Sequence, residues 1–316
     1  MRNLTLRQLR SIQAIDHHGT IAAASRQLGL TAPAVTLQVK QLEDDCGLAL
    51  FDRTREGMRL TVAGAAVLEA ANAIETTLRA LSDEILAIKG VRSGTIRLGV
   101  VSTAKYFAPR LIAAFRREYP AIEIKLTVGN RLEIIRDLKS YQLDIALMGR
   151  PPIEFPVEAM VFGDHPLVMI SAPEHPLAKA RDIDRARLLK ETIIIREPGS
   201  GTRASLEGFF AGHPGELDEV SVEMGSNETI KQAVMAGLGI AFISAHTIAF
   251  EVEMGRLVIL DVEHLPIRRQ WHAVGRKERM PAPAEIAFKD FLVKRGAVHL
   301  PLLGKLYPAE GMVAEG

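Results

Sequence analysis

The sequence predicts a chain in three parts: an N-terminal all-α winged helix-turn-helix, a long linker helix, and a C-terminal α/β region of two Rossmann-like subdomains. Two short helix patterns flank a glycine turn within 20–46, an apolar heptad repeat fills 61–90, and strands alternate with helices from residue 94. The 316 residues suffice for two or three domains. We expect these boundaries: 1–60 for DNA binding; 61–90 for the linker; 94–300 for a ligand-binding domain, with subdomain I about 94–164 and 266–300 and subdomain II about 165–265; and 301–316 for a flexible tail.

Two helices joined by a tight turn form the core of the N-terminal prediction. Thr20 is a good N-cap for an alanine-rich first helix, and Gly29 closes it because its turn needs a residue that tolerates positive φ. Thr31 caps the second helix, and Pro33 lies in its first turn, where a missing N–H costs nothing. The pattern fits a helix-turn-helix DNA reader, and an ordinary helical hairpin is the alternative.

The second helix offers a small, polar and basic surface that suits a major groove. An amphipathic helix with apolar positions from Leu6 to Ile15 precedes the pair, and 50–61 reads as a basic β-wing. Residues 1–60 carry eight Lys and Arg against six Asp and Glu, so the basic character is local and modest. The predicted DNA-binding residues are Ala32, Pro33, Ala34, Thr36, Gln38, Lys40 and Arg53.

The linker carries a heptad seam, with apolar residues at alternating steps of four and three: Val67, Ala71, Ile74, Leu78, Leu81, Ile85 and Ile88. An intermolecular coiled coil fits this narrow stripe better than a helix docked on its own domain, whose stripe is broader. The predicted dimerisation residues are Ile74, Leu78, Leu81, Ile85 and Ile88. Two DNA readers on such a linker would address a two-fold symmetric site.

Composition limits the remaining possibilities. With 47% hydrophobic and 24% charged residues the chain resembles a soluble globular protein, and no apolar stretch suits a membrane span or signal peptide. We therefore expect a cytoplasmic protein without membrane contact. The net charge of +1 argues against coating nucleic acid by bulk charge. Cys46, the single cysteine, excludes an intramolecular disulfide and Cys-based zinc clusters, and we expect no metal site and no cofactor.

After residue 94 the pattern predicts two parallel α/β subdomains joined by two crossovers, a hinged pair. Several loops between a strand and a helix carry hydroxyls, amides or arginines, and helix starts present free N–H groups to anions. Such loops gather at the carboxyl ends of the strands, facing the crevice. The predicted ligand-binding residues are Ser102, Thr103, Lys105, Asn130, Arg131, Arg150, Arg196, Ser200, Gly201, Thr202, Arg203 and Asn227. The plain alternative is that they are helix caps and surface salt bridges.

Two rival classes remain. Catalysis is disfavoured because Ser200 lies in Gly-Ser-Gly rather than a nucleophile elbow, and the nine histidines show no metal-ligand spacing. A free-standing solute-binding protein of the same hinged fold would suit 94–300 alone, but the N-terminal DNA reader argues against it.

The N-terminal part carries a recognisable set of residues: Ala22-Ala23-Ala24, Leu28, Pro33-Ala34-Val35, Gln38, Leu42-Glu43, Gly47, Leu50-Phe51 and Arg53. The C-terminal part carries further recognisable segments at 98–109, 129–131, 148–152, 196–203 and 224–234. With these residues, the heptad linker and the hinged α/β pair, the sequence resembles the LysR-type transcriptional regulators over essentially the entire chain, and among them the regulators of Calvin-cycle (RuBisCO) operons. The resemblance implies subdomains of the periplasmic-binding-protein type and a dimer of dimers that acts on promoter DNA with RNA polymerase. It also implies an activator that bends DNA differently when a sugar phosphate, phosphoenolpyruvate or NADPH binds between the subdomains.

Overall fold

The computed structural model describes residues 4–55, 57–88 and 93–301, which form two compact units. The first contains the chain up to Ser82 with Ser140–Gln142, and the second contains the rest from Asp83 onward. The predicted tail at 301–316 lies outside the described residues except for Pro301, as does the end of the predicted linker at 89–92. No helix in the described part of the chain has the length and apolar character needed to cross a membrane.

The first unit is a three-helix bundle with a two-stranded wing. Its elements are α1 (Leu6–His18), α2 (Ile21–Leu28), α3 (Ala32–Cys46), β1 (Phe51–Thr54) and β2 (Gly57–Leu60). Gly29 ends α2 with a φ of 64°, and the Thr20 and Thr31 side chains cap α2 and α3 as the sequence predicts. Ile12, Val35 and Leu42 are fully buried in the shared core.

The linker helix α4 (Val62–Ile88) divides into two halves with different surroundings. Val67 and Ala71 pack into the core of the first unit, and Glu75 lies 3.2 Å from Arg10 of α1. The heptad positions nearest the wing are thus covered by their own domain, so the seven-position seam is not a free coiled-coil stripe throughout. In the other half Leu81 is 52% exposed, and Ile85 and Ile88 are exposed as well.

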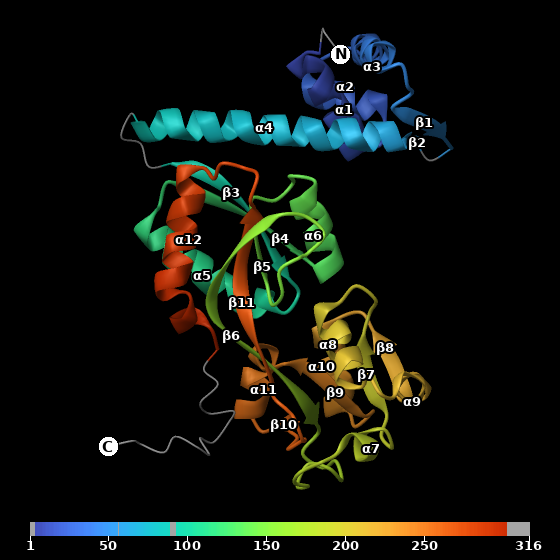
Figure 1. The fold of residues 1–316 in the computed structure, drawn as a ribbon, viewed down its shortest axis with the longest axis vertical. Coiled ribbons are helices and arrows are strands. Elements are labelled where there is room, and N and C mark those ends of the chain that lie inside the picture. The colour runs from blue at the N-terminus through green and yellow to red at the C-terminus, as the bar shows by residue number, and fades with distance from the viewer. Residues whose placement is uncertain (1–3, 56, 89–92, 302–316) are drawn as a thin grey trace. The chain divides into compact units, whose positions relative to one another are not determined.

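The first half of the second unit is an α/β layer built on three parallel strands. Its elements are β3 (Gly94–Val101), α5 (Ala108–Glu118), β4 (Ile122–Gly129), α6 (Arg131–Lys139), β5 (Ile145–Met148) and the returning α12 (Pro283–Arg295). Helices α5 and α12 lie on one side of these strands and α6 on the other (Figure 1). Phe115, Phe288 and Ile134 contribute to its buried core.

The second half repeats this plan. Its elements are α7 (Arg185–Leu188), β7 (Ile193–Arg196), α8 (Gly201–Phe209), α9 (Pro214–Val220), β8 (Ser221–Met224), α10 (Asn227–Met235), β9 (Ile240–Ser244), α11 (Ala249–Glu253) and β10 (Val258–Ile259). Strands and helices alternate in β7, α8, β8, α10 and β9, as the sequence predicts for this half, while α7, α9, α11 and β10 add four short elements to this pattern. These four elements are short, so little periodicity marks them.

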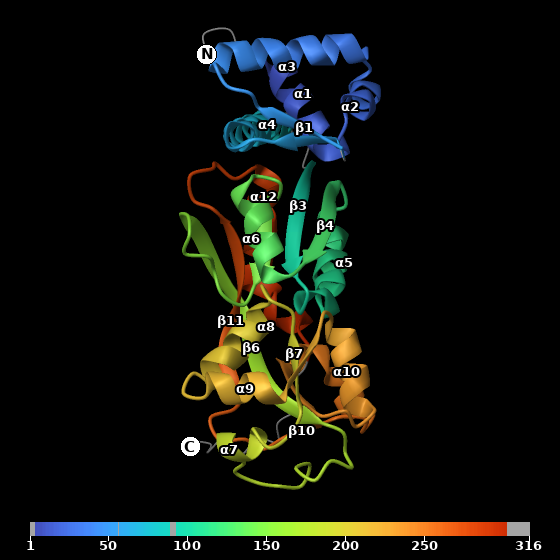
Figure 2. The ribbon, with the colours of Figure 1, turned by 90° about the vertical axis from the view of Figure 1, so that its right-hand side faces the viewer.

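Two long strands, β6 (Val157–Ser171) and β11 (Ile267–Arg276), run side by side through both halves (Figure 2). They pair antiparallel, and they join the halves in one nine-stranded sheet of order β4-β3-β5-β11-β6-β9-β7-β8, with β10 beside β6. Within each half the strands run parallel as predicted, β3 with β4 and β5 and β7 with β8 and β9, while the two crossover strands run antiparallel to their neighbours. The two crossovers themselves were predicted, and they form the connection between the halves.

Candidate functional site

Helix α3 presents the surface predicted to meet DNA. Pro33, Thr36 and Lys40 are exposed, and Ala32 and Ala34 are half-buried. The Thr36 hydroxyl donates a hydrogen bond to the Ala32 carbonyl at 2.9 Å, which keeps this side chain close to the helix surface. Small side chains let a helix approach base edges closely. This face has the shape and polarity of a groove reader.

Two other parts of the predicted DNA-binding surface, Gln38 and the wing, contact the rest of the first unit. Gln38 is half-buried, and its Oε1 accepts a hydrogen bond from the buried Ser11 hydroxyl of α1, which leaves the amide N–H groups and one oxygen lone pair for a base edge. Arg53 is exposed on β1, opposite Met58. Met58 N donates to Gly19 O at 2.8 Å, which fixes the wing against the end of α1. Among the described residues, neither Arg53 nor Lys40 forms an ion pair.

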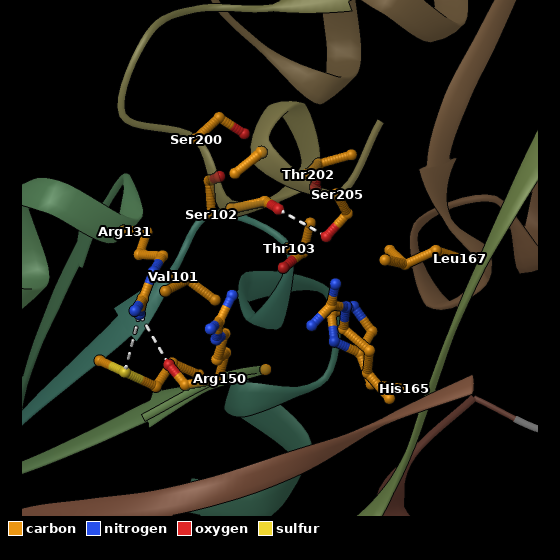
Figure 3. Close-up of a pocket in the computed structure, with 15 residues that line it drawn as sticks. Val101, Ser102, Thr103, Arg131, Arg150, His165, Leu167, Ser200, Thr202 and Ser205 are labelled. Atoms are coloured by element: carbon orange, nitrogen blue, oxygen red, sulfur yellow. Dashed lines mark hydrogen bonds between the residues drawn. The ribbon is translucent and has the colours of Figure 1, made fainter. Parts of the chain in front are cut away.

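A cavity of about 80 Å³ lies between the two halves of the second unit (Figure 3). Seven of the twelve predicted ligand-binding residues line it: Ser102, Thr103, Arg131, Arg150, Ser200, Gly201 and Thr202. They come from the ends of β3 and β5 and from the starts of α6 and α8, the places where the argument from strand ends put them. No Asp or Glu is among the lining residues.

The start of α8 brings hydroxyls to one wall of the cavity. Ser200 is the N-cap and its side chain accepts from Arg203 N, while Thr202 is buried in the first turn. Ser205 also lines the cavity, and its hydroxyl donates to Gly201 O at 2.9 Å (Figure 3). These side chains stand beside the free N–H groups of the first turn, which favour an anion.

Arginines line the opposite side of the cavity. Arg131 donates to the backbone oxygen of Arg150 at 2.6 Å and approaches Met148 Sδ, so it holds the loop after β5 (Figure 3). Burial lowers the pKa of Arg131 and the Glu154 carboxylate opposes this effect, while the charges of Arg150 and Arg269 lower the pKa further. The cavity is therefore a site of unbalanced positive charge.

The other five predicted residues do not line this cavity. Arg196 is 3% exposed and donates to Glu197, to Asn227 Oδ1 at 2.7 Å and to the Ser102 hydroxyl at 3.1 Å. Arg203 pairs with Glu207 at 2.8 Å and with Glu223 at 2.6 Å. Arg196 and Arg203 thus form salt bridges within the protein, which was the alternative to ligand binding in the sequence analysis.

Lys105 and Asn130 also have partners of their own. Lys105 Nζ lies 2.9 Å from Glu228, which also accepts from the Tyr106 hydroxyl at 2.7 Å. Burial alone would raise the pKa of Glu228, but these two hydrogen bonds bring it down to about 2. Asn130 Oδ1 accepts from Glu133 N at the start of α6, as a helix cap does. The contacts of Lys105 and Tyr106 with Glu228 bridge the two halves of the unit.

Sequence reasoning missed two cationic or titratable groups of the cavity, His165 on β6 and Arg269 on β11. Both lie within strands, where no helix start or turn marks them. His165 is buried and its ring stacks on Trp271 with 3.9 Å between the centroids. The strand expected from the sequence spans 167–171 and does not reach His165, so nothing in the pattern singled out this histidine.

Models of two families cover most of the chain. Residues 6–65 match the bacterial regulatory helix-turn-helix protein of the lysR family, and residues 89–297 match the LysR substrate binding domain. The chain belongs to the LysR family. It is thus a DNA-binding transcriptional regulator rather than an enzyme, which confirms the resemblance seen in the sequence.

Individual relatives agree over nearly the whole length. The HTH-type transcriptional regulator CbbR of Rhizobium meliloti is 60% identical over 98% of this chain and 99% of its own length. The RuBisCO operon transcriptional regulator of Allochromatium vinosum is 44% identical over 93% of this chain and 97% of its own. A solved structure of the Synechocystis PCC6803 CcmR regulatory domain in complex with 2-PG is 37% identical, covers 64% of this chain and 97% of that domain, and has a TM-score of 0.60.

Proposed function

We propose that this LysR-family member regulates a carbon-fixation (RuBisCO) operon and responds to a small phosphorylated carboxylate bound between the halves of its second unit. The single observation that carries the ligand proposal is the cavity, lined by three arginines and several hydroxyls with no Asp or Glu. Arginine forks suit carboxylate and phosphate oxygens. The names of the relatives from Rhizobium meliloti and Allochromatium vinosum support the choice of operon.

The size of the cavity favours one class among the three ligands that the sequence suggests. A volume of about 80 Å³ is small beside the roughly 300–1,000 Å³ of typical ligand pockets, so the cavity favours a compact anion of a few carbons, such as phosphoenolpyruvate or 2-phosphoglycolate, over a sugar bisphosphate or NADPH. The 2-PG bound in the related CcmR domain is in keeping with this. A ligand that bridges both halves favours one hinge geometry, and it shifts the regulator only as far as its affinity differs between the two states.

Calorimetry and footprinting on the full-length protein test this proposal together. We expect 2-phosphoglycolate or phosphoenolpyruvate to release heat on binding and to change the footprint on the neighbouring promoter, with NADPH as the large-ligand comparison. Inorganic sulfate at the same ionic strength controls for unspecific anion effects. If the whole panel gave neither heat nor a changed footprint, the proposed effector class would be wrong.

We also propose that the chain acts as a dimer of dimers on promoter DNA, in contact with RNA polymerase, and that the far half of α4 mediates dimerisation. Leu81, Ile85 and Ile88 leave apolar side chains exposed there. Leu81→Asp should dissociate the dimer, because a partner helix would bury an unpaired charge. Val62→Asp is the matched control, since Val62 is 92% exposed on the same helix and outside the heptad positions. Equal sedimentation of the two variants would contradict this interface.

A further inference from the structure

His165 is a buried histidine whose ring nitrogens have no hydrogen-bond partner among the described residues. It is 6% exposed and lines the cavity, on the strand that links the two halves of the unit. A buried polar atom left unpaired costs free energy, commonly about 1–3 kcal/mol. Its neighbour His246 is also buried but accepts a hydrogen bond from Trp271 Nε1 at 3.0 Å. The unpaired state of His165 thus needs an explanation of its own.

The backbone around His165 is arranged to accept an imidazole ring. A Cβ atom on Gly149 would lie 2.4 Å from His165 Nδ1, so this glycine at the end of β5 is what leaves room for the ring. On its other side the ring stacks on the Trp271 indole at 3.9 Å with an interplanar angle of 19°. The ring is therefore held in one orientation at the cavity wall.

The charged groups that face His165 are all cations or other histidines. Arg150 follows β5, Arg269 projects from β11, and the ring of His246 lies 6.3 Å away. Helix α8 contributes no charged side chain to the cavity lining. Burial, and then the neighbouring His246 and Arg269, hold the pKa of His165 well below its ordinary value. These surroundings therefore favour the neutral imidazole.

We propose that His165 binds the anionic effector directly and takes up one proton from solvent as it does so. The inference rests on the proposed binding of a phosphorylated carboxylate in this cavity. The proton goes to a ring nitrogen, which then donates a hydrogen bond to the ligand, and no bond of the ligand is made or broken. An anion at this point reverses the local field and stabilises the imidazolium. The stacked Trp271 face stabilises the same cation.

The sign of the pH dependence follows from this exchange. Ligand binding raises the pKa of His165, so affinity increases as pH falls through the interval between its values in the bound and free protein. In this interval the affinity gain approaches tenfold for each pH unit when one full proton is taken up. As the pH falls to about 6, the phosphate group of the ligand takes up a proton and loses its second negative charge. The effect of His165 on affinity is therefore best measured between about pH 6.5 and 8.5.

Calorimetry of the full-length protein with 2-phosphoglycolate measures the proton directly. Titrations at one pH in buffers of different ionisation enthalpy give the number of protons taken up per ligand bound. His165→Gln keeps an N–H donor of similar size that does not titrate. His246→Gln is the matched control, because His246 is buried beside the same Trp271 but does not line the cavity.

We expect net proton uptake in the wild type and in His246→Gln, and its loss in His165→Gln. Uptake in the wild type can be judged without any variant, so a misfolded variant does not decide the result. Trp271 is the only tryptophan, and its fluorescence should fall on ligand binding, because a protonated imidazole quenches a stacked indole. Binding without proton uptake would overturn the inference and leave the proposed function intact. Absence of binding to the wild type would overturn the proposed function itself.

Discussion

Two arginine groups in the second unit carry the same charge but stand in opposite surroundings. Arg196 is the last residue of β7 and Arg203 lies in the first turn of α8, and carboxylates pair with both arginines at 2.6–2.8 Å. Arg150 and Arg269, beside β5 and on β11, line a cavity without any Asp or Glu. Carboxylates of the protein already neutralise Arg196 and Arg203. The charges of Arg150 and Arg269 are therefore the ones available to an anionic ligand. Position near a strand end is therefore not enough to make an arginine a ligand-binding residue.

Replacing Arg196 tests most strongly whether the paired arginines have a structural role. Its side chain is buried, and its loss leaves Glu197 without its partner and Asn227 Oδ1 without a donor. Breaking a buried pair in this way destabilises a protein by about 3–5 kcal/mol. We expect Arg196→Met to lower the free energy of unfolding by this amount, measured by urea denaturation of the full-length protein. A loss below about 1 kcal/mol would mean that the pairing of Arg196 is not structural.

Removal of Arg150 should have the complementary effect. Arg150 is exposed, so Arg150→Gln should change the free energy of unfolding by no more than about 0.5 kcal/mol. A charged hydrogen bond to a ligand contributes about 1.5–3 kcal/mol, so affinity for 2-phosphoglycolate should fall roughly 10- to 100-fold. Calorimetry measures this loss. Unchanged affinity would place the anion elsewhere and remove the distinction between the two groups.

The comparison also explains how far sequence reasoning reached. Caps, glycine turns and strong apolar periodicity are local signals, and they predicted the helix-turn-helix, the linker helix and the alternation of strands and helices after residue 94. The same local signals placed Ser102, Thr103 and Thr202 at helix starts beside the cavity. Local signals do not reveal which carboxylate pairs with each arginine. Glu223, which neutralises Arg203, lies on β8, twenty residues further along the chain.

His165 and Arg269 were missed for the same physical reason. They lie on β6 and β11, which pair only after the chain has passed through the whole second half of the unit. Neither residue follows a strand end or begins a helix, so no local rule applies to it. In the linker, likewise, the heptad rhythm of Val67 and Ala71 could not reveal that their own domain covers them. Burial by distant segments is a tertiary property, and a single sequence shows it poorly.

Replacing Arg203 should have the smallest effect on stability, and it separates a salt-bridge role from an effector-binding role. It was expected to bind the effector, yet its guanidinium pairs with Glu207 and Glu223, whose side chains are about half exposed. The hydrogen bonds that the Arg203 guanidinium donates to these two carboxylates, Glu207 first, raise the pKa of Arg203 against the opposing effect of burial. Partly exposed pairs contribute about 0–1 kcal/mol each.

Arg203→Gln should therefore cost about 1 kcal/mol of stability and leave the affinity for 2-phosphoglycolate within roughly twofold of the wild type. Combining it with Glu223→Gln completes a double-mutant cycle. If Arg203 serves the salt bridge, the two losses of stability should be less than additive, because each variant removes the same interaction. A large loss of affinity with additive stabilities would reverse the assignment: Arg203 would then leave its carboxylates for the ligand, and paired arginines would have to be counted among the effector-binding residues.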